Sequence, residues 1–154
     1  MRQQATPLEH WGVGMPHKRP EDLSSVEDRW PVMVARSRNE HPYLAEVWGD
    51  MNVALTWIDS PIDCTEMYRE GGLAGGVCPC PHYGYVFEGR IRARYPDTGL
   101  PDEVVEAGEA YFIPAGHVLI YEAPTKSLEF HPSYAFEQIQ DALERAIERT
   151  RPAT

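Results

Sequence analysis

The sequence predicts an all-β barrel or double-sheet jelly roll followed by one C-terminal helix. From about residue 30 onward, short β-like runs alternate with turn residues along the chain. The chain contains 12 glycines and 14 prolines among its 154 residues, which favours frequent turns over long helices. Many short strands at close spacing are typical of closed barrels and of paired antiparallel sheets.

The chain has the size of one ordinary domain and is acidic. With 154 residues it can bury a core without disulfides. Fourteen basic residues against 24 acidic ones give a net charge of −10 at pH 7, which disfavours binding to nucleic acid. The sequence lacks the apolar run of about 18–20 residues that a membrane span needs, and its first residues lack a secretory signal. We therefore expect a cytoplasmic protein with neither a nucleic-acid nor a membrane partner.

The chain divides into three parts. Residues 1–30 are polar and interrupted by prolines, and they predict an irregular N-terminal arm with a short helix over residues 21–27. Residues 31–132 predict the β-barrel. The expected strands are Val32–Arg36, Leu44–Trp48, Val53–Asp59, Cys64–Arg69, Tyr83–Tyr95, Glu103–Ala107, Ala110–Ile113, Val118–Glu122 and Ser127–His131.

Residues 133–150 predict an amphipathic C-terminal helix. Four apolar residues recur there at helical spacing, and charged residues occupy the rest of each turn. These apolar residues are Phe136, Ile139, Leu143 and Ile147. We expect this apolar stripe to cover the barrel or a partner subunit.

A segment rich in cysteine and proline carries the first chemical signal. Cys78, Cys80 and His82 follow one another at every second position, and the intervening prolines favour an extended backbone. In an extended strand these three side chains would share one face. Thiolate and imidazole ligands suit zinc first, then iron or copper. The alternative is a strand entry whose thiols are buried and bind nothing, and Cys64 is expected to be a small core residue.

Two stretches resemble the cupin superfamily. Residues Gly108–Gly116 contain a glycine, five residues, a proline, one residue and a glycine, as in the second cupin motif, and Glu88-Gly89-Arg90 resembles the end of the first motif. The run from Cys78 to Gly89 also resembles small cupins that carry a Cys-x-Cys-Pro-His segment. The resemblance covers about residues 60–132 and implies a cupin-type jelly-roll barrel that forms a homodimer. It implies little about the reaction, because cupins include enzymes, storage proteins and regulators.

The chain departs from the usual cupin metal ligands. The glutamate of the first motif falls at His82, and the histidine of the second motif falls at Leu119, two residues beyond His117. The set that the sequence offers for a metal is Cys78, Cys80, His82 and His117. A separation of about 35 residues allows His82 and His117 to converge in a barrel. His131 could replace one of these ligands.

The number of protein side chains that bind the metal distinguishes the functional alternatives. If all four groups bind, the site is a closed tetrahedral zinc, as in a structural site or a redox or metal sensor without enzymatic activity. If one cysteine points away, an open fourth position permits an enzyme that acts on a small molecule in the barrel. A metal-free cupin is the third alternative. Tyr121 shares a strand face with His117 and is the expected catalytic donor, whereas Tyr111, Glu122 and Glu129 are expected barrel lining.

Overall fold

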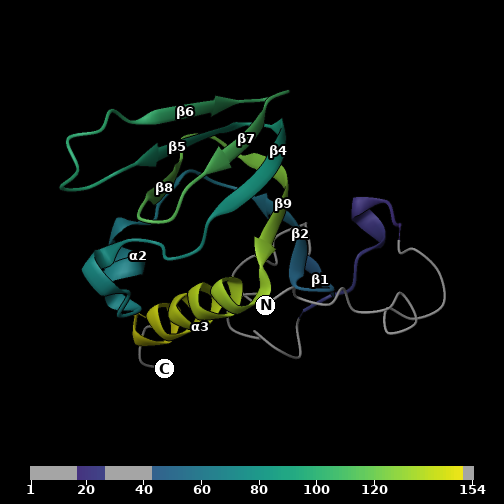
Figure 1. Cartoon of the computed structure of the whole chain (residues 1–154), viewed down its shortest axis with the longest axis horizontal. Helices are drawn as coiled ribbons and strands as arrows, with labels where there is room; N and C mark the ends of the chain where they lie inside the picture. The colour runs from purple at the N-terminus through teal and green to yellow at the C-terminus, as the bar shows by residue number, and fades with distance from the viewer. Residues whose placement is uncertain (1–16, 27–42, 151–154) are drawn as a thin grey trace, which may run out of the picture.

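The computed structural model describes residues 17–26 and 43–150, which form two antiparallel sheets and a long C-terminal helix (Figure 1). The first sheet has the order β1 (Leu44–Trp48), β2 (Met51–Ile58), β9 (Thr125–Pro132), β4 (His82–Glu88) and β7 (Ala110–Ile113). The second sheet has the order β3 (Ile62–Asp63), β8 (Val118–Tyr121), β5 (Arg90–Arg94) and β6 (Glu103–Glu106). The predicted all-β jelly roll with a C-terminal helix is therefore confirmed.

Most of the predicted strands lie where expected, but the run Tyr83–Tyr95 forms two strands instead of one. The break is at Gly89, whose φ of 91° few other residues adopt. A Cβ atom there would lie 2.3 Å from the carbonyl oxygen of Pro124. Gly89 therefore lets the chain pass from the first sheet to the second. The predicted strand Val32–Arg36 lies outside the described residues.

The predicted strand Cys64–Arg69 is wrong, because this segment forms the helix α2 (Thr65–Glu70). The carboxylate of Asp63 accepts a hydrogen bond of 2.9 Å from the backbone N–H of Thr65 and so satisfies a donor of the first turn. Cys64 and Tyr68 are both buried. A spacing of four residues places two side chains on one face in a strand and in a helix alike, so the apolar pattern did not distinguish the two.

The segment 17–26 lies against the edge of the first sheet. It contains a single 3₁₀ turn, η2 (Pro20–Asp22), where the sequence predicts a helix over residues 21–27, of which residue 27 is outside the described residues. Leu23 packs against Leu44, Val53 and Leu55, and Ser25 forms a β-bridge with Leu44. The segment thus covers part of the outer face of the sheet.

The C-terminal helix α3 (Ser133–Thr150) begins where the sequence predicts and lies along the open end of the two sheets (Figure 1). Phe136 and Ile139 are buried in the same core cluster as both sheets, so the apolar stripe covers the barrel of its own chain. The guanidinium of Arg145 donates two hydrogen bonds to the carbonyl of Gly71, which connects α3 to the end of α2. No helix within residues 17–26 and 43–150 is long and apolar enough to cross a membrane.

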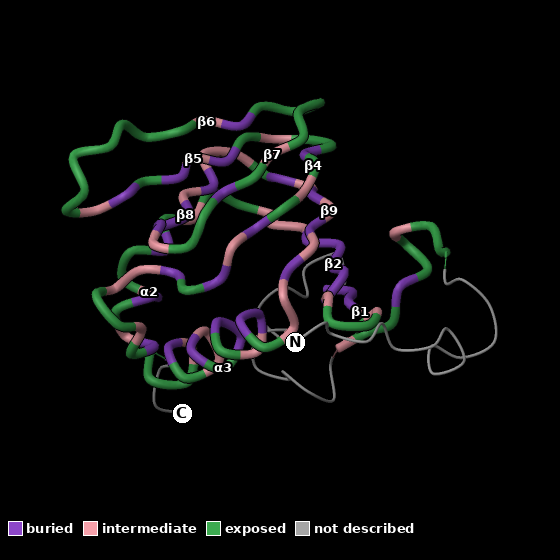
Figure 2. Tube along the Cα trace, viewed as in Figure 1, coloured by how far each residue is buried: buried purple, intermediate pink, exposed green. Residues whose placement is uncertain are grey.

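The first sheet has a polar inner face and an aromatic outer face. Along β9 every second residue is buried, and the residues between them are only half-buried (Figure 2). The buried set includes Ser127, Glu129 and His131. On the outer face, four aromatic side chains remain exposed: Tyr83, Tyr85, Phe87 and Phe112. The inner face therefore holds the groups that can carry chemistry.

Candidate metal centre

His82, the first residue of β4, uses both of its ring nitrogens in two different groups of side chains. Its Nε2 lies 3.5 Å from the sulfur of Cys78, and its Nδ1 lies 3.1 Å from Nε2 of His131. We call Cys78, His82 and His117 the cysteine group, and His82, Glu129 and His131 the carboxylate group. Within each group, one ligand atom per residue lies within 4.8 Å of the others, and all five residues are buried. His82 therefore belongs to both candidate metal sites.

The backbone holds Cys78 and His117 side by side. The N–H of Cys78 donates to the carbonyl of His117 at 2.8 Å, and the N–H of Gly116 donates to the carbonyl of Cys78 at 2.8 Å. Gly116 adopts a φ of 94°, which glycine permits at the turn before His117. This antiparallel bridge brings together two residues that are far apart in the sequence.

His117 presents an unpaired nitrogen in the interior. Its Nδ1 lies 2.6 Å from the carbonyl oxygen of Pro114, which can only accept, so Nδ1 carries the proton. Burial lowers the pKa of His117 to about 4, so the ring is neutral at pH 7. Its Nε2 is buried and has no hydrogen-bond partner among the described residues. A histidine fixed by a carbonyl at one nitrogen, with a free lone pair at the other, is the usual form of a metal ligand.

The two cysteines of the Cys78–His82 segment differ in what they face. The backbone N–H of Cys80 donates to the sulfur of Cys78 at 3.4 Å, and the Cys80 thiol donates to the carbonyl of Pro81 at 3.4 Å. Burial raises the pKa of Cys80, which keeps its thiol protonated. The chain bends at Cys80 before β4 begins, so the alternation of an extended strand does not hold there. The structure thus brings Cys78, His82 and His117 together and leaves the Cys80 sulfur outside both groups.

The carboxylate group is a hydrogen-bonded network around Glu129. One oxygen of Glu129 lies 2.9 Å from Nε2 of His131, and the other accepts a hydrogen bond of 2.7 Å from the hydroxyl of Tyr111. Burial raises the pKa of Glu129, but the hydrogen bonds from His131 and His82 outweigh this effect and hold the pKa well below its usual value. Glu129 is therefore an ionised carboxylate that orients the Nδ1 side of His82.

One distance in the cysteine group matches the spacing of two neighbouring ligands on a tetrahedral metal ion. A tetrahedral zinc with bonds of about 2.3 Å to sulfur and 2.0–2.1 Å to nitrogen places these ligand atoms about 3.5 Å apart. The distance from the Cys78 sulfur to Nε2 of His82 is 3.5 Å. One thiolate and two imidazoles leave a fourth position for water or substrate. The hydrogen-bond partners described above would then fix all three ligands.

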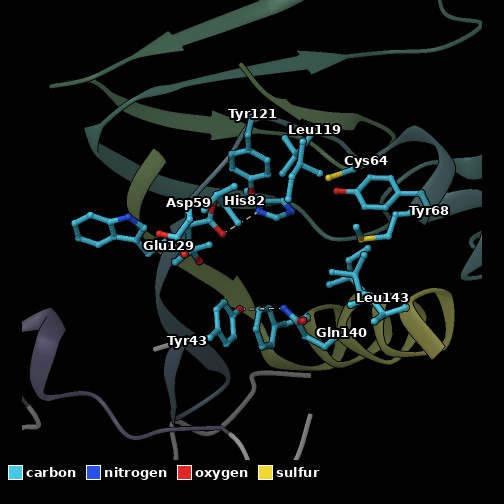
Figure 3. Close-up of a pocket in the computed structure, with 18 of the residues that line it drawn as sticks. Tyr43, Asp59, Cys64, Tyr68, His82, Leu119, Tyr121, Glu129, Gln140 and Leu143 are labelled. Atoms are coloured by element: carbon cyan, nitrogen blue, oxygen red, sulfur yellow. Dashed lines mark hydrogen bonds and ion pairs between the residues drawn. The ribbon is translucent and has the colours of Figure 1, made fainter. Parts of the chain in front are cut away.

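A cavity of about 320 Å³ lies between the inner face of the sheets and α3 (Figure 3). His82, Glu129 and His131 reach its wall, whereas Cys78 and His117 do not. Tyr121 also lines the cavity, and burial raises its pKa, so its phenol stays protonated and can donate a hydrogen bond. Of the predicted site residues, Cys78, His82 and His117 form the cysteine group, and His82 and Tyr121 line the cavity. Cys80 belongs to neither.

Two polar residues of the cavity wall were not identified from the sequence. The side-chain amide of Gln140 in α3 donates a hydrogen bond of 3.0 Å to the hydroxyl of Tyr43 (Figure 3). Gln140 is buried and follows Ile139 of the apolar stripe directly. A polar residue inside an apolar helical stripe is the sequence signal that could have revealed it.

Comparison with known proteins gives only structural similarities, at low sequence identity. No protein-family model and no curated protein matches the sequence. A Rhizobium leguminosarum protein of unknown function has a TM-score of 0.48 and 12% identity, with 77% of this chain and 96% of that chain covered.

Two further solved structures, a cupin-2 domain protein and an iron(II) protein, have weaker similarity to this chain. A cupin-2 domain protein from Shewanella frigidimarina has a TM-score of 0.39 and 15% identity, with 63% of this chain and 85% of that chain covered. The iron(II) form of HppE has a TM-score of 0.38 and 10% identity, with 58% of this chain and 49% of that chain covered. These TM-scores lie below 0.5, so the fold class is assigned from the chain's own two antiparallel sheets and C-terminal helix.

Proposed function

We propose that the chain is a metal-binding cupin enzyme that holds zinc at Cys78, His82 and His117 and a small molecule in the adjacent cavity. The observation that carries this proposal is the buried Nε2 of His117, which has no hydrogen-bond partner in residues 17–26 and 43–150. A buried nitrogen lone pair without a partner is costly. A metal ion shared with the Cys78 sulfur and Nε2 of His82 would remove that cost.

His82 is the residue that would couple the metal to the cavity. Its Nε2 faces the Cys78 sulfur, while its Nδ1 lies 3.1 Å from His131 and 3.5 Å from Glu129 on the cavity wall. Zinc bound there would supply Lewis acidity at an open fourth position. The Glu129–His131 pair would hold or accept a proton at the cavity, and the hydroxyl of Tyr121 would donate to the bound molecule.

One observation favours a different role for the same metal. Cys78 and His117 are completely buried and do not line the cavity. A metal sealed in this way would stabilise the barrel or respond to oxidation of Cys78, as in a structural or sensor module without enzymatic activity. A second sulfur ligand from Cys80 would close the coordination and favour this role.

A second observation favours a different position for the metal. In the carboxylate group the three distances between ligand atoms are 2.9, 3.1 and 3.5 Å, which also suit the neighbouring ligands of one ion. Two histidines and one carboxylate with an open face are typical of non-haem iron sites. This set would place the ion directly on the cavity wall, with iron replacing zinc.

Zinc content is the test of the proposed function. We expect about one zinc per chain in the purified protein and none in Cys78→Ser, measured by elemental analysis. Cys64→Ser is the matched control, because Cys64 is also buried but belongs to neither ligand group. Zinc retained in Cys78→Ser, or absent from the wild-type protein, would contradict the proposal and favour the carboxylate group or a metal-free cupin.

The homodimer and the cytoplasmic location stay predictions. Light scattering of the purified chain tests the first, and a monomer mass would contradict it. Fractionation of cells that produce the protein tests the second.

A further inference from the structure

The charged side chains on the cavity wall limit the ligands that the cavity can bind. Among the described residues that line it, Asp59 and Glu129 are acidic and none is lysine or arginine. Both ring nitrogens of His82 are already in contact with Cys78, Glu129 and His131. A carboxylate or phosphate group in this cavity would therefore lie near two acidic side chains and find no lysine, no arginine and no free nitrogen of His82 to pair with, which is strongly unfavourable.

The opposite side of the cavity is apolar. α3 supplies Phe136, Ile139 and Leu143, and α2 supplies Met67 and Tyr68. The volume of about 320 Å³ lies at the lower end of the range for small-molecule sites. These walls suit an aromatic or aliphatic body of modest size, which would gain free energy from burial.

One polar atom on the apolar side lacks a partner. Gln140 is 5% exposed, and its Nε2 donates to the hydroxyl of Tyr43. Its Oε1 is buried and accepts no hydrogen bond from any described residue. Buried polar atoms are nearly always hydrogen-bonded, so an unpaired acceptor on a cavity wall marks the position of a ligand donor. In Figure 3 Gln140 and Tyr43 lie together on the α3 side of the cavity, across from His82.

We infer that the cavity binds a small molecule with an apolar body and a hydrogen-bond-donating head group that carries no negative charge, namely an amine or an alcohol. The head group donates to Oε1 of Gln140, and the apolar body lies against α2 and α3. This inference rests on the proposed function only in placing a small molecule in the same cavity, because it makes no use of the metal.

Calorimetric titration of the full chain with three matched probes tests the inference. The probes are phenylpropylamine, phenylpropanol and phenylpropanoate, which share one body and differ in the head group. We expect the amine and the alcohol to bind at least about tenfold more tightly than the carboxylate. Gln140→Leu should weaken the amine and the alcohol by about tenfold, the equivalent of one buried hydrogen bond. Gln138→Leu, at an exposed position of the same helix, is the matched control and should change nothing.

Three results would overturn the inference. Tighter binding of the carboxylate would contradict the charge argument, and equal affinities of the Gln140→Leu and Gln138→Leu proteins would contradict the assigned position of the head group. Failure of all three probes to bind would contradict the assignment of the cavity as a site of this class. Zinc content, measured on the same samples, separates the two proposals. If the purified wild-type protein contains no zinc but binds the amine, the proposed function is contradicted and the inference stands.

Discussion

The two sides of the His82 ring show how one side chain can belong to two different environments. On the Nε2 side, Cys78 and His117 are fully buried, and a backbone bridge holds them together. On the Nδ1 side, Glu129 and His131 form a hydrogen-bonded network that reaches a cavity. The first side offers sulfur and a free lone pair, which suit a metal, and the second offers charged and proton-carrying groups, which suit a ligand. The two nitrogens of one histidine thus contact different kinds of group, a buried cysteine on one side and a carboxylate–histidine network on the other.

The largest expected effect is on zinc binding, when one histidine on either side of His82 is replaced. His117→Ala should abolish stoichiometric zinc binding, because it deletes a direct ligand. His131→Ala should leave about one zinc per chain at saturation and weaken the affinity by about 10–100-fold, as expected for a residue that only orients a ligand. Elemental analysis and a competition titration with a chromophoric chelator measure both quantities.

The reverse result would exchange the roles of the two sides. Zinc lost in His131→Ala but kept in His117→Ala would move the ion to the carboxylate group. Cys80→Ser is a further check, since the Cys80 sulfur lies outside both groups. We expect this variant to keep its metal, and loss would restore the four-ligand site predicted from the sequence.

The next effect is a pH dependence of zinc affinity. Burial lowers the pKa of His82, but the hydrogen bonds and charges of Cys78 and Glu129 outweigh this and raise the pKa to about 9 in the metal-free protein. Zinc must displace that proton, so its apparent affinity should rise by about tenfold per pH unit from pH 7 towards 9. The pKa of His117, lowered to about 4, adds no dependence in this range. Chelator competition at several pH values measures the slope, and a flat profile would contradict thiolate and imidazole binding.

A smaller effect concerns the stability of the carboxylate side. Tyr111→Phe removes the donor to a buried, ionised Glu129 and should lower the free energy of unfolding by about 2 kcal/mol. Tyr95→Phe is the matched control, because the hydroxyl of Tyr95 donates at 2.8 Å to Glu103, which is exposed. Urea unfolding of both variants should show a loss for Tyr95→Phe of well under about 1 kcal/mol. Equal losses would mean that the Glu129 network is no more tightly held than the surface.

The smallest effect tests the catalytic candidate. Tyr121 lines the cavity, and burial raises its pKa, so Tyr121→Phe removes one neutral donor. We expect binding of the alcohol probe to weaken by about three- to tenfold while the zinc content stays unchanged. Unchanged binding would remove Tyr121 from the ligand site, and loss of zinc would mean that it supports the metal instead.

The sequence predicted the strands well because their apolar alternation and the glycine and proline turns are local features. The ends of the β7 strand agree with the prediction, as does the start of the C-terminal helix. The helix α2 was missed because the apolar pattern of the segment fits a strand equally well, and the hydrogen bond from Thr65 to Asp63 in its first turn is not part of that pattern.

The sequence predicted those site residues that lie next to a proline or a glycine in the chain. Cys78 precedes Pro79, whereas His82 follows Pro81 and His117 follows Gly116, and the structure brings the three residues together. Two other features depend on the folded chain. Glu129 and His131 reach His82 because β9 lies between β2 and β4, an order that local pattern does not reveal. The bend at Cys80 likewise breaks an alternation that the prolines alone would allow.

X-ray absorption at the metal edge of the purified protein identifies the metal and the atoms that bind it. We expect one zinc per chain with one sulfur, two imidazole nitrogens and a further light atom. A shell of nitrogen and oxygen without sulfur would contradict it and place the ion at Glu129 and His131. Two sulfurs would contradict the open position and indicate a closed structural site that includes Cys80.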